Sequence, residues 1–440
     1  MKFCALKLGV MLTLSLAAGP AWAALTAQRT VLPNGLVLLT SEQRALPMVA
    51  LELVIDAGSR HESAQQAGLA NLTARLLTYG TKHRNALQIS ESLDFLGASL
   101  ATGASENLAS ISLTVLKKDL AAGLALLGEI LTGATFPQDE VDRQKQAVIA
   151  ALKAQEEDPG AVAGRAFAAA LFPKSPYGRP VEGTEASVKN LQAQRLREFF
   201  SRYYRPNRSI MAVVGDVNER EISQALNQAL RGWSKGLPST PPTVPAAIGA
   251  PQTIRIVKDL TQANIILGHA GVPRGHPDYY AIQVLNYILA GGGFSSRAME
   301  SIRNERGLVY SVYSYFSADQ SHGSFQFVMQ TKNESAGEAI RLAVDEMRKL
   351  RAEPVGEQEL EDAKNYLIGS YPLRFDTNRR VAGFLTQVEV FGLGLDFADR
   401  YGELIGRVSR ADVQRVAKEF LHPDQLISVI VGDQSKLSLK

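Results

Sequence analysis

Side chains that could ligate a metal or act as nucleophiles are scarce in this sequence of 440 residues. Histidine occurs six times, and no two histidines lie three or four residues apart, so no helix presents a pair for one metal ion. His269 and His276 lie seven apart, and we interpret them as solvated loop histidines. Cysteine occurs once, at Cys4, which excludes a disulfide framework within the chain. We find no Ser–His–Asp or Cys-based constellation for a self-sufficient hydrolase.

The residues best suited to chemistry are Arg303 and Tyr310. A guanidinium donates hydrogen bonds in a rigid fork, and a phenol can donate to a carbonyl oxygen as that oxygen becomes an oxyanion. Each residue also has a purely structural interpretation. Arg303 could be a solvated cation at a helix C-terminus, and Tyr310 could be a core aromatic on a strand.

A helix–turn–strand corner would position this pair. Ser295-Ser296 offers an N-cap, and the pattern predicts a helix over residues 297–306 that ends at Gly307. Residues 309–316 then alternate with β-branched and aromatic side chains, as a strand does. Such a corner can direct Arg303 and Tyr310 into one cavity.

The elements around this corner belong to a unit that occurs twice. Residues 204–216 and 421–433 share a Pro-Asn/Asp start and a Gly-Asp end at an offset of 217 residues. Upstream, apolar positions at the same offset predict an amphipathic helix in each copy, followed by a strand that ends at Gly-Asp. The predicted strands 49–55 and 265–268 are each followed by Ala-Gly and then by a helix, at 67–77 and 279–289.

The two copies define the domain organisation. Residues 236–250 include four prolines and therefore predict a linker between an N-terminal domain, 28–235, and a C-terminal domain, 251–440. Each domain runs strands, helices, then strands again, which favours an α+β fold with two homologous domains.

The first residues have the pattern of an export signal. Lys2 and Lys7 precede the apolar run 8–18, and Ala21-Trp22-Ala23 matches a cleavage site, so residues 1–23 are predicted to be a signal peptide. The alternative, a membrane anchor, is disfavoured because the run is shorter than the ~20 residues a span needs. We expect export to the periplasm, or secretion, and no membrane span afterwards. The net charge of +3 implies no nucleic-acid partner.

Several short motifs, taken in order, resemble the insulinase/pitrilysin family of inverted-motif zinc peptidases, in its processing-peptidase-like branch. The motifs are Asp56-Ala57-Gly58-Ser59-Arg60, Ala67-Gly68-Leu69-Ala70, Tyr177-Gly178-Arg179-Pro180 and Arg306-Gly307-Leu308-Val309-Tyr310-Ser311. The resemblance implies two domains, each a mainly antiparallel sheet packed with helices, that enclose a peptide chamber like a clam. It also implies that an Arg and a Tyr at the positions of Arg303 and Tyr310 hold the substrate near the scissile bond.

The zinc motif of that family is absent here. Active members carry H-x-x-E-H after Gly-Leu-Ala, with a further Glu on a later helix, predicted here over residues 140–156. The two His positions hold Asn71 and Arg75, the Glu position holds Ala74, and the distal Glu aligns with Ala150 or Ala151, of which we take Ala151. Alanine cannot ligate or abstract a proton, and a fixed arginine cation repels a divalent metal.

The resemblance and the missing ligands together predict a zinc-free, non-catalytic subunit of an exported heteromeric metallopeptidase. It would be inactive alone, with no cofactor of its own, and would supply half of the peptide chamber and the Arg303/Tyr310 pair to a homologous partner that carries zinc. The alternative is a stand-alone peptide-binding or scaffold protein. An adjacent gene for an exported homologue with an intact motif would favour the subunit hypothesis.

Overall fold

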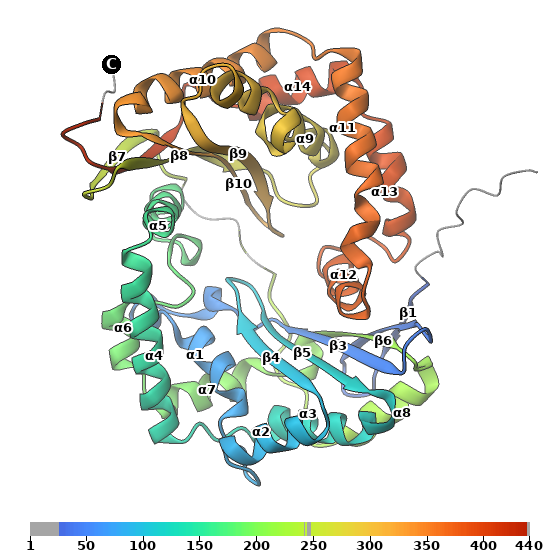
Figure 1. The fold of residues 1–440 in the computed structure, drawn as a ribbon. Helices are drawn as coiled ribbons and strands as arrows, with labels where there is room; N and C mark the ends of the chain where they lie inside the picture. Colours follow the sequence, from blue (N-terminus) through green and yellow to red (C-terminus); the bar gives the residue numbers. More distant parts are fainter. Residues whose placement is uncertain (1–25, 242, 244–247, 438–440) are drawn as a thin grey trace, which may run out of the picture.

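A computed structural model describes residues 26–241, 243 and 248–437. The chain forms two halves, each a β-sheet with helices on its outer side, and the sheets face each other (Figure 1). This arrangement confirms the predicted α+β, clam-like fold. The predicted signal peptide, residues 1–23, lies outside the described residues, as do residues 242 and 244–247 of the predicted linker.

The first sheet has six strands in the order β1-β2-β6-β3-β5-β4. Only β2 and β6 pair in parallel, so the sheet is mainly antiparallel as predicted. The strands are β1 (Gln28–Val31), β2 (Val37–Glu42), β3 (Met48–Ile55), β4 (Ser99–Ala104), β5 (Ala109–Leu116) and β6 (Ser209–Gly215).

Helices α1 to α8 belong to this half, and α2, α3 and α8 lie on the outer side of its sheet (Figure 1). Apolar side chains of α1, α3 and α7 join the alternating inward residues of β3 and β5 in one core. The helices are α1 (Leu69–Arg75), α2 (Ala86–Phe95), α3 (Leu120–Gly133), α4 (Gln138–Glu156), α5 (Pro159–Leu171), α6 (Glu185–Asn190), α7 (Ala193–Tyr203) and α8 (Glu219–Ala229).

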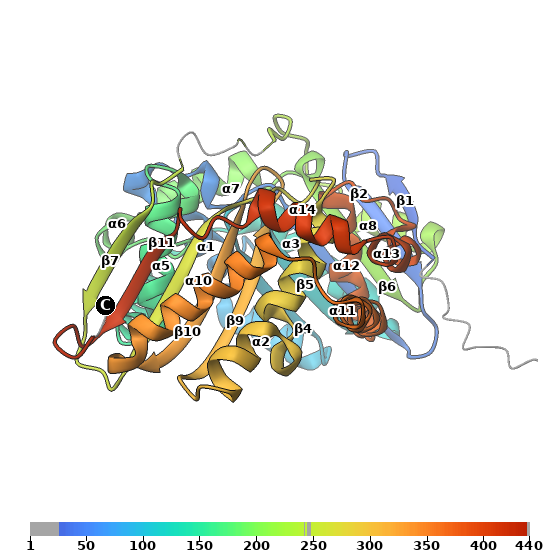
Figure 2. The ribbon, with the colours of Figure 1, turned by 90° about the horizontal axis from the view of Figure 1, so that it is seen from above.

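The second sheet has five strands in the order β7-β11-β8-β10-β9, with β7 and β11 parallel and the other pairs antiparallel. Seen from above, α10 and α14 lie over the sheet, and α11 to α13 form a group beside it (Figure 2). The strands are β7 (Gln252–Val257), β8 (Gln262–Gly271), β9 (Val309–Ala318), β10 (Gly323–Lys332) and β11 (Ile427–Gly432). The helices are α9 (Tyr279–Asn286), α10 (Ala336–Ala352), α11 (Glu357–Gly369), α12 (Asn378–Val390), α13 (Phe397–Gly406) and α14 (Arg410–Phe420).

The two halves repeat one another as the sequence predicts. Helices α7 and α14 begin and end at the predicted offset, and each leads through a proline turn into a strand that ends at glycine, β6 and β11. The predicted strands and helices at the start of each half are β3 with α1, and β8 with α9. Each parallel strand pair also recurs, with β2/β6 matched by β7/β11.

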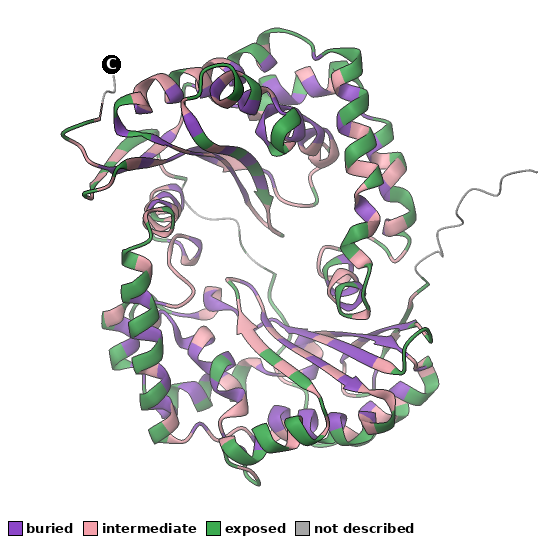
Figure 3. Ribbon diagram, in the orientation of Figure 1, coloured by how far each residue is buried: buried purple, intermediate pink, exposed green. Residues whose placement is uncertain are grey.

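One helix of each half packs against the sheet of the other half. Phe167 of α5 is fully buried against Ile266 of β8 and Val429 of β11. Conversely, Leu385 of α12 packs with Leu39 of β2 and the strand β6. Both helices carry buried residues, and Figure 3 shows those of α12 where this helix lies next to the first sheet. These reciprocal contacts hold the two halves in one assembly.

The turn between β9 and β10 makes a third contact. The Asn107 amide donates to Asp319 Oδ1 at 2.6 Å, and the Tyr177 hydroxyl donates to Asn107 Oδ1 at 3.0 Å. His322 lies 4.0 Å from the Tyr177 ring, centroid to centroid.

Among the described helices, none is long and apolar enough to cross a membrane.

Candidate functional site

Helix α1 carries three of the four positions that the resemblance assigns to zinc chemistry. It begins after Gly68, whose φ of +96° and 2.6 Å approach of a Cβ to the Glu182 carbonyl oxygen require glycine. Asn71 and Arg75 lie one turn apart on the same side of the helix. Ala74 is fully buried, so its methyl group fills packed space where an active enzyme would need a base.

Helix α4 faces this part of α1. Gln144 is a buried polar residue on the otherwise apolar inner side of α4, and Arg75 Nη2 donates to its Oε1 at 3.4 Å. Ala151 lies seven residues beyond Gln144 and therefore on the same face of α4. Ala150 points about a third of a turn away from that face. Ala151 therefore shares a face of α4 with Gln144 whereas Ala150 does not, and both alanines are exposed.

These side chains do not fit a zinc ion. Ala74 and Ala151 offer no donor atom, and the Arg75 guanidinium places a permanent cation where a ligand would be required. Within the part of the chain that the structure describes, no group of three or more His, Cys, Asp or Glu residues could hold a metal ion.

The interpretation of His269 as a solvated loop histidine is wrong. His269 lies in β8 and is only 5% exposed. Its Nδ1 lies 2.8 Å from the Ala270 carbonyl oxygen, and its Nε2 accepts from the backbone N–H of His422 at 3.2 Å. Burial lowers the pKa of His269 to about 4, so the ring stays neutral and its two nitrogens are used within the fold.

Arg303 lies where the helix–turn–strand prediction places it. The helix that begins after Ser296 becomes π-helical over Met299–Asn304, and Gly307, with φ +62°, ends it as predicted. The Arg303 guanidinium carbon lies 5.1 Å from the centroid of the Phe294 ring, and its Nη1 contacts Met299 Sδ at 3.7 Å. No carboxylate pairs with Arg303 among the described residues.

Tyr310 owes its exposure to a β-bulge. Gln330 of β10 pairs with Ser311 and Thr331 pairs with Val309, so Tyr310 is the extra, unpaired residue. Regular alternation would place Tyr310 on the buried face, but the bulge turns Val309 into the core and leaves Tyr310 73% exposed. Tyr310 is therefore not a core aromatic. Among the described contacts, no hydrogen bond joins Tyr310 to Arg303. The two side chains therefore do not contact each other through a hydrogen bond in this structure.

Two further tyrosines extend this surface along β9. Tyr313 and Tyr315 are exposed, and their rings lie 6.3 Å apart. They pair with Val328 and Gln326 of β10, and Val328 packs in the cluster that receives α5. These tyrosines therefore lie on the face of the second sheet that is turned toward the first half. The alternation of exposed tyrosines along residues 309–316 was the sequence signal for them.

The chain matches known protein families over most of its length. Residues 37–185 match the family described as "Insulinase (Peptidase family M16)", and residues 190–367 match "Peptidase M16 inactive domain". The chain belongs to the insulinase (M16) peptidase family. The first half of this M16 protein carries the altered α1, and the second half carries Arg303 and Tyr310.

The relatives of this M16 protein include chains named as zinc proteases and one named as a non-peptidase. It is 28% identical to an uncharacterized zinc protease of Streptomyces coelicolor, over 92% of this chain and 89% of that protein. It is 26% identical to a non-peptidase homolog of Helicobacter pylori, over 91% and 92% of the two chains. A crystal structure titled as a peptidase M16 inactive domain from Pseudomonas fluorescens superimposes with a TM-score of 0.89 at 28% identity, covering 94% and 99% of the chains.

A buried carboxyl group supports the start of α1 in this M16 protein. Glu62 Oε2 accepts from the Gly68 N–H at 3.0 Å, and Oε1 accepts from the Ala70 N–H. Burial raises the pKa of Glu62 to about 7, although both backbone bonds and the nearby Arg179 favour the charged form. Neither Glu62 nor Gln144 is among the residues predicted from the sequence. Only Gln144 has a sequence signal, as a polar residue within the apolar stripe of α4.

The raised pKa of Glu62 predicts how stability depends on pH. The folded protein retains a proton that the unfolded chain releases above its ordinary pKa of 4.5, so this stabilisation is complete below 4.5 and is lost as the pH rises through 7. The contribution of Glu62 to the free energy of unfolding should therefore fall by about 2–3 kcal/mol between pH 5 and pH 8. Buried His269 contributes with the opposite sign, because its lowered pKa makes stability rise with pH over part of that range. Denaturant titrations at several pH values measure the free energy of unfolding.

Glu62→Gln should remove this contribution, because an amide does not titrate in that range. The difference in the free energy of unfolding between the variant and the unaltered protein should therefore change by about 2–3 kcal/mol from pH 5 to pH 8. The exposed Glu91→Gln is the matched control and should leave the slope unchanged. An identical slope in Glu62→Gln and in the unaltered protein would show that another group causes the pH dependence.

Proposed function

We propose that this chain is the zinc-free subunit of an exported two-chain metallopeptidase. It would supply half of the peptide chamber, together with Arg303 and Tyr310, to a homologous subunit that binds zinc. This proposal rests on a contrast between the overall fold, which is that of the family, and the zinc positions, which are altered. The two-half M16 architecture is complete, whereas α1 and α4 present Ala74, Arg75 and Ala151 in place of base and ligands.

The second half supports the same proposal from its own geometry. The bulge in β9 exposes a phenol, and the helix before it ends in a guanidinium held over Phe294. Hydrogen-bond donors of this kind can stabilise an oxyanion that forms at a metal ion on another chain. Export is part of the proposal because residues 1–23 have the pattern of a signal peptide.

Co-purification tests the proposal. The mature chain is expressed alone, and also together with an exported M16 homologue that has an intact H-x-x-E-H motif, and metal content is measured by elemental analysis. Alone, the chain should contain no stoichiometric zinc and cleave no peptide. With the homologue it should form a stable complex that contains zinc and hydrolyses unfolded polypeptides faster than the homologue alone.

One tightly bound zinc in the chain purified without a partner would refute the zinc-free part of the proposal. The alternative function, a stand-alone peptide-binding or scaffold protein, is favoured by the relative named as a non-peptidase homolog. Absence of any complex, combined with peptide binding by the chain alone, would support that alternative.

A further inference from the structure

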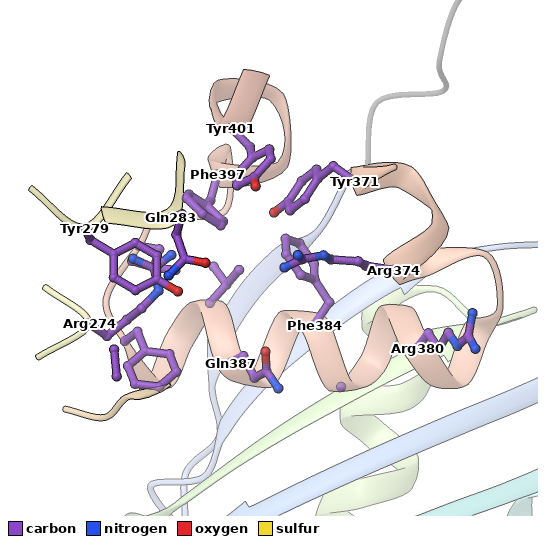
Figure 4. Close-up of a pocket in the computed structure, with 15 residues that line it drawn as sticks. Arg274, Tyr279, Gln283, Tyr371, Arg374, Arg380, Phe384, Gln387, Phe397 and Tyr401 are labelled. Atoms are coloured by element: carbon purple, nitrogen blue, oxygen red, sulfur yellow. The ribbon is translucent and has the colours of Figure 1, made fainter. Parts of the chain in front are cut away.

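The second half contains a cavity of about 670 Å³ that is lined by Ala318, at the end of β9 opposite Tyr310, and not by Arg303. It lies between the start of α9, the inner side of α12, the start of α13 and the 3-10 turn Tyr371–Phe375 (Figure 4). Six aromatic side chains line it: Tyr279, Tyr371, Phe384, Phe391, Phe397 and Tyr401. Tyr371 and Tyr401 stack with centroids 3.6 Å apart and planes at 10°, which fixes this part of the wall.

The charges around the cavity are all positive. Arg274, Arg374 and Arg380 line it, and no Asp or Glu does. Arg380 is already satisfied, because it donates to Asp376 at 2.9 Å and to the Leu373 carbonyl oxygen at 3.1 Å. In the described part of the chain, the guanidinium groups of Arg274 and Arg374 have no carboxylate partner. Arg274 lies 3.9 Å over the Tyr279 ring, which holds it at the wall.

A buried hydroxyl group is also left without a partner. Tyr371 is 5% exposed, and its Oη makes no hydrogen bond in the structure. In Figure 4 this hydroxyl is turned toward the middle of the cavity, and Arg374 and Gln283 reach toward the same space. A buried polar group without a partner costs about 1–3 kcal/mol, so a ligand that accepts a hydrogen bond from Tyr371 would remove that cost.

We propose that this cavity binds a carboxylate attached to an apolar or aromatic body, as in the C-terminal residue of a peptide. The fork of Arg374 matches the two oxygens of a carboxylate, with Arg274 as a second cation and the Tyr371 hydroxyl as a third donor. The aromatic walls accept the apolar side chain. A strongly hydrated inorganic anion would gain nothing from those walls. The site requires no partner subunit and so stands independently of the proposed function.

Isothermal titration of the isolated chain tests this proposal with four probes. They are acetyl-Gly-Gly-Phe with a free carboxylate, the same peptide as its C-terminal amide, acetyl-phenylalanine, and inorganic phosphate. The free acid should bind with one-to-one stoichiometry and at least about tenfold more tightly than the amide, because the amide lacks the charge that the arginines recognise. Tighter binding of the peptide than of acetyl-phenylalanine indicates a peptide C-terminus, and equal binding indicates a small carboxylic acid.

Three variants locate the site. Arg374→Ala should weaken binding of the free acid by about tenfold or more, and Tyr371→Phe, which keeps the ring, by about three- to tenfold. Arg380→Ala is the matched control, since Arg380 lines the same cavity but is paired with Asp376, and it should change affinity by less than about twofold. Thermal unfolding confirms that each variant is folded. Equal binding of acid and amide, no binding of either, phosphate binding as tight as the acid, or an equal effect of Arg380→Ala would each overturn the proposal.

Discussion

Arg303→Ala and Tyr310→Phe are each expected to lower peptide hydrolysis by the assembled two-chain peptidase by about two to three orders of magnitude. On the proposed function, each variant removes one donor to the oxyanion that forms during attack on the scissile carbonyl. Tyr310→Phe keeps the ring and the β-bulge that exposes it, so the change is confined to one hydroxyl group. Single-turnover hydrolysis by the reconstituted complex measures the loss, and gel filtration confirms assembly.

The chain offers matched controls for both variants. Tyr313 is an exposed tyrosine three residues further along the same strand, and Arg306 is an exposed arginine one turn beyond Arg303 that pairs with Glu338 at 3.3 Å. Tyr313→Phe and Arg306→Ala should leave turnover within about threefold of the unaltered complex. The double variant of Arg303 and Tyr310 should lose less than the product of the single losses, because both groups hold one substrate segment. Full activity in the double variant would show that the pair is structural.

The spacing of apolar residues along the chain predicted the helices and strands of this fold. It could do so because each helix buries one side and each strand buries one face. The apolar spacing before Tyr204 and Leu421 defined α7 and α14, and Gly307 ended the helix that carries Arg303. Both depend on residues close together in the chain, whose preferences act before any long-range packing. Because the sequence repeats, the elements predicted in one half also predicted the corresponding elements of the other half.

Contacts between distant segments could not be predicted in this way. Phe167 packs against Ile266 and Leu385 packs against Leu39, so each contact joins residues from opposite halves. The apolar face of α5 or of α12 predicts that the helix is buried on that side, but not which strand covers it. The cavity likewise combines Arg274 with Arg374, which only the packing of α9, α12 and α13 brings together. His269 was misassigned for the same reason, since its burial depends on Phe325 and His422 from other strands and loops.

The bulge at Tyr310 was not predicted either. Val309 and Val312 are both buried although they are three residues apart, which is incompatible with regular alternation of faces along a strand. The burial of both valines indicates one extra residue in β9, which the alternation expected for residues 309–316 did not predict. Its consequence, the exposure of Tyr310, follows only when the pairing with Gln330 and Thr331 is known. The alternatives for Tyr310 could therefore be separated only by the register of the sheet.

Restoring ligands to α1 and α4 is expected to create a zinc site where the present side chains exclude one. Asn71→His, Arg75→His and Ala151→Glu together place three donors on facing sides of the two helices, since residue 75 already reaches Gln144 of α4. Zinc should then stabilise the folded chain by about 4 kcal/mol at a free concentration one thousand times the dissociation constant. Elemental analysis and thermal unfolding with and without zinc measure this gain.

The position of the new glutamate provides the control. Ala150→Glu in place of Ala151→Glu directs the carboxylate away from the Gln144 face, so zinc affinity should fall by about tenfold or more. Tighter binding by the Ala150 version would show that the alignment of α4 is wrong by one residue. Adding Ala74→Glu supplies the general base, but residue 74 is fully buried, so the larger charged side chain should cost a few kcal/mol of stability. The three-residue variant should therefore bind zinc without hydrolysing peptide, and activity should require further changes that make room for a base beside the metal.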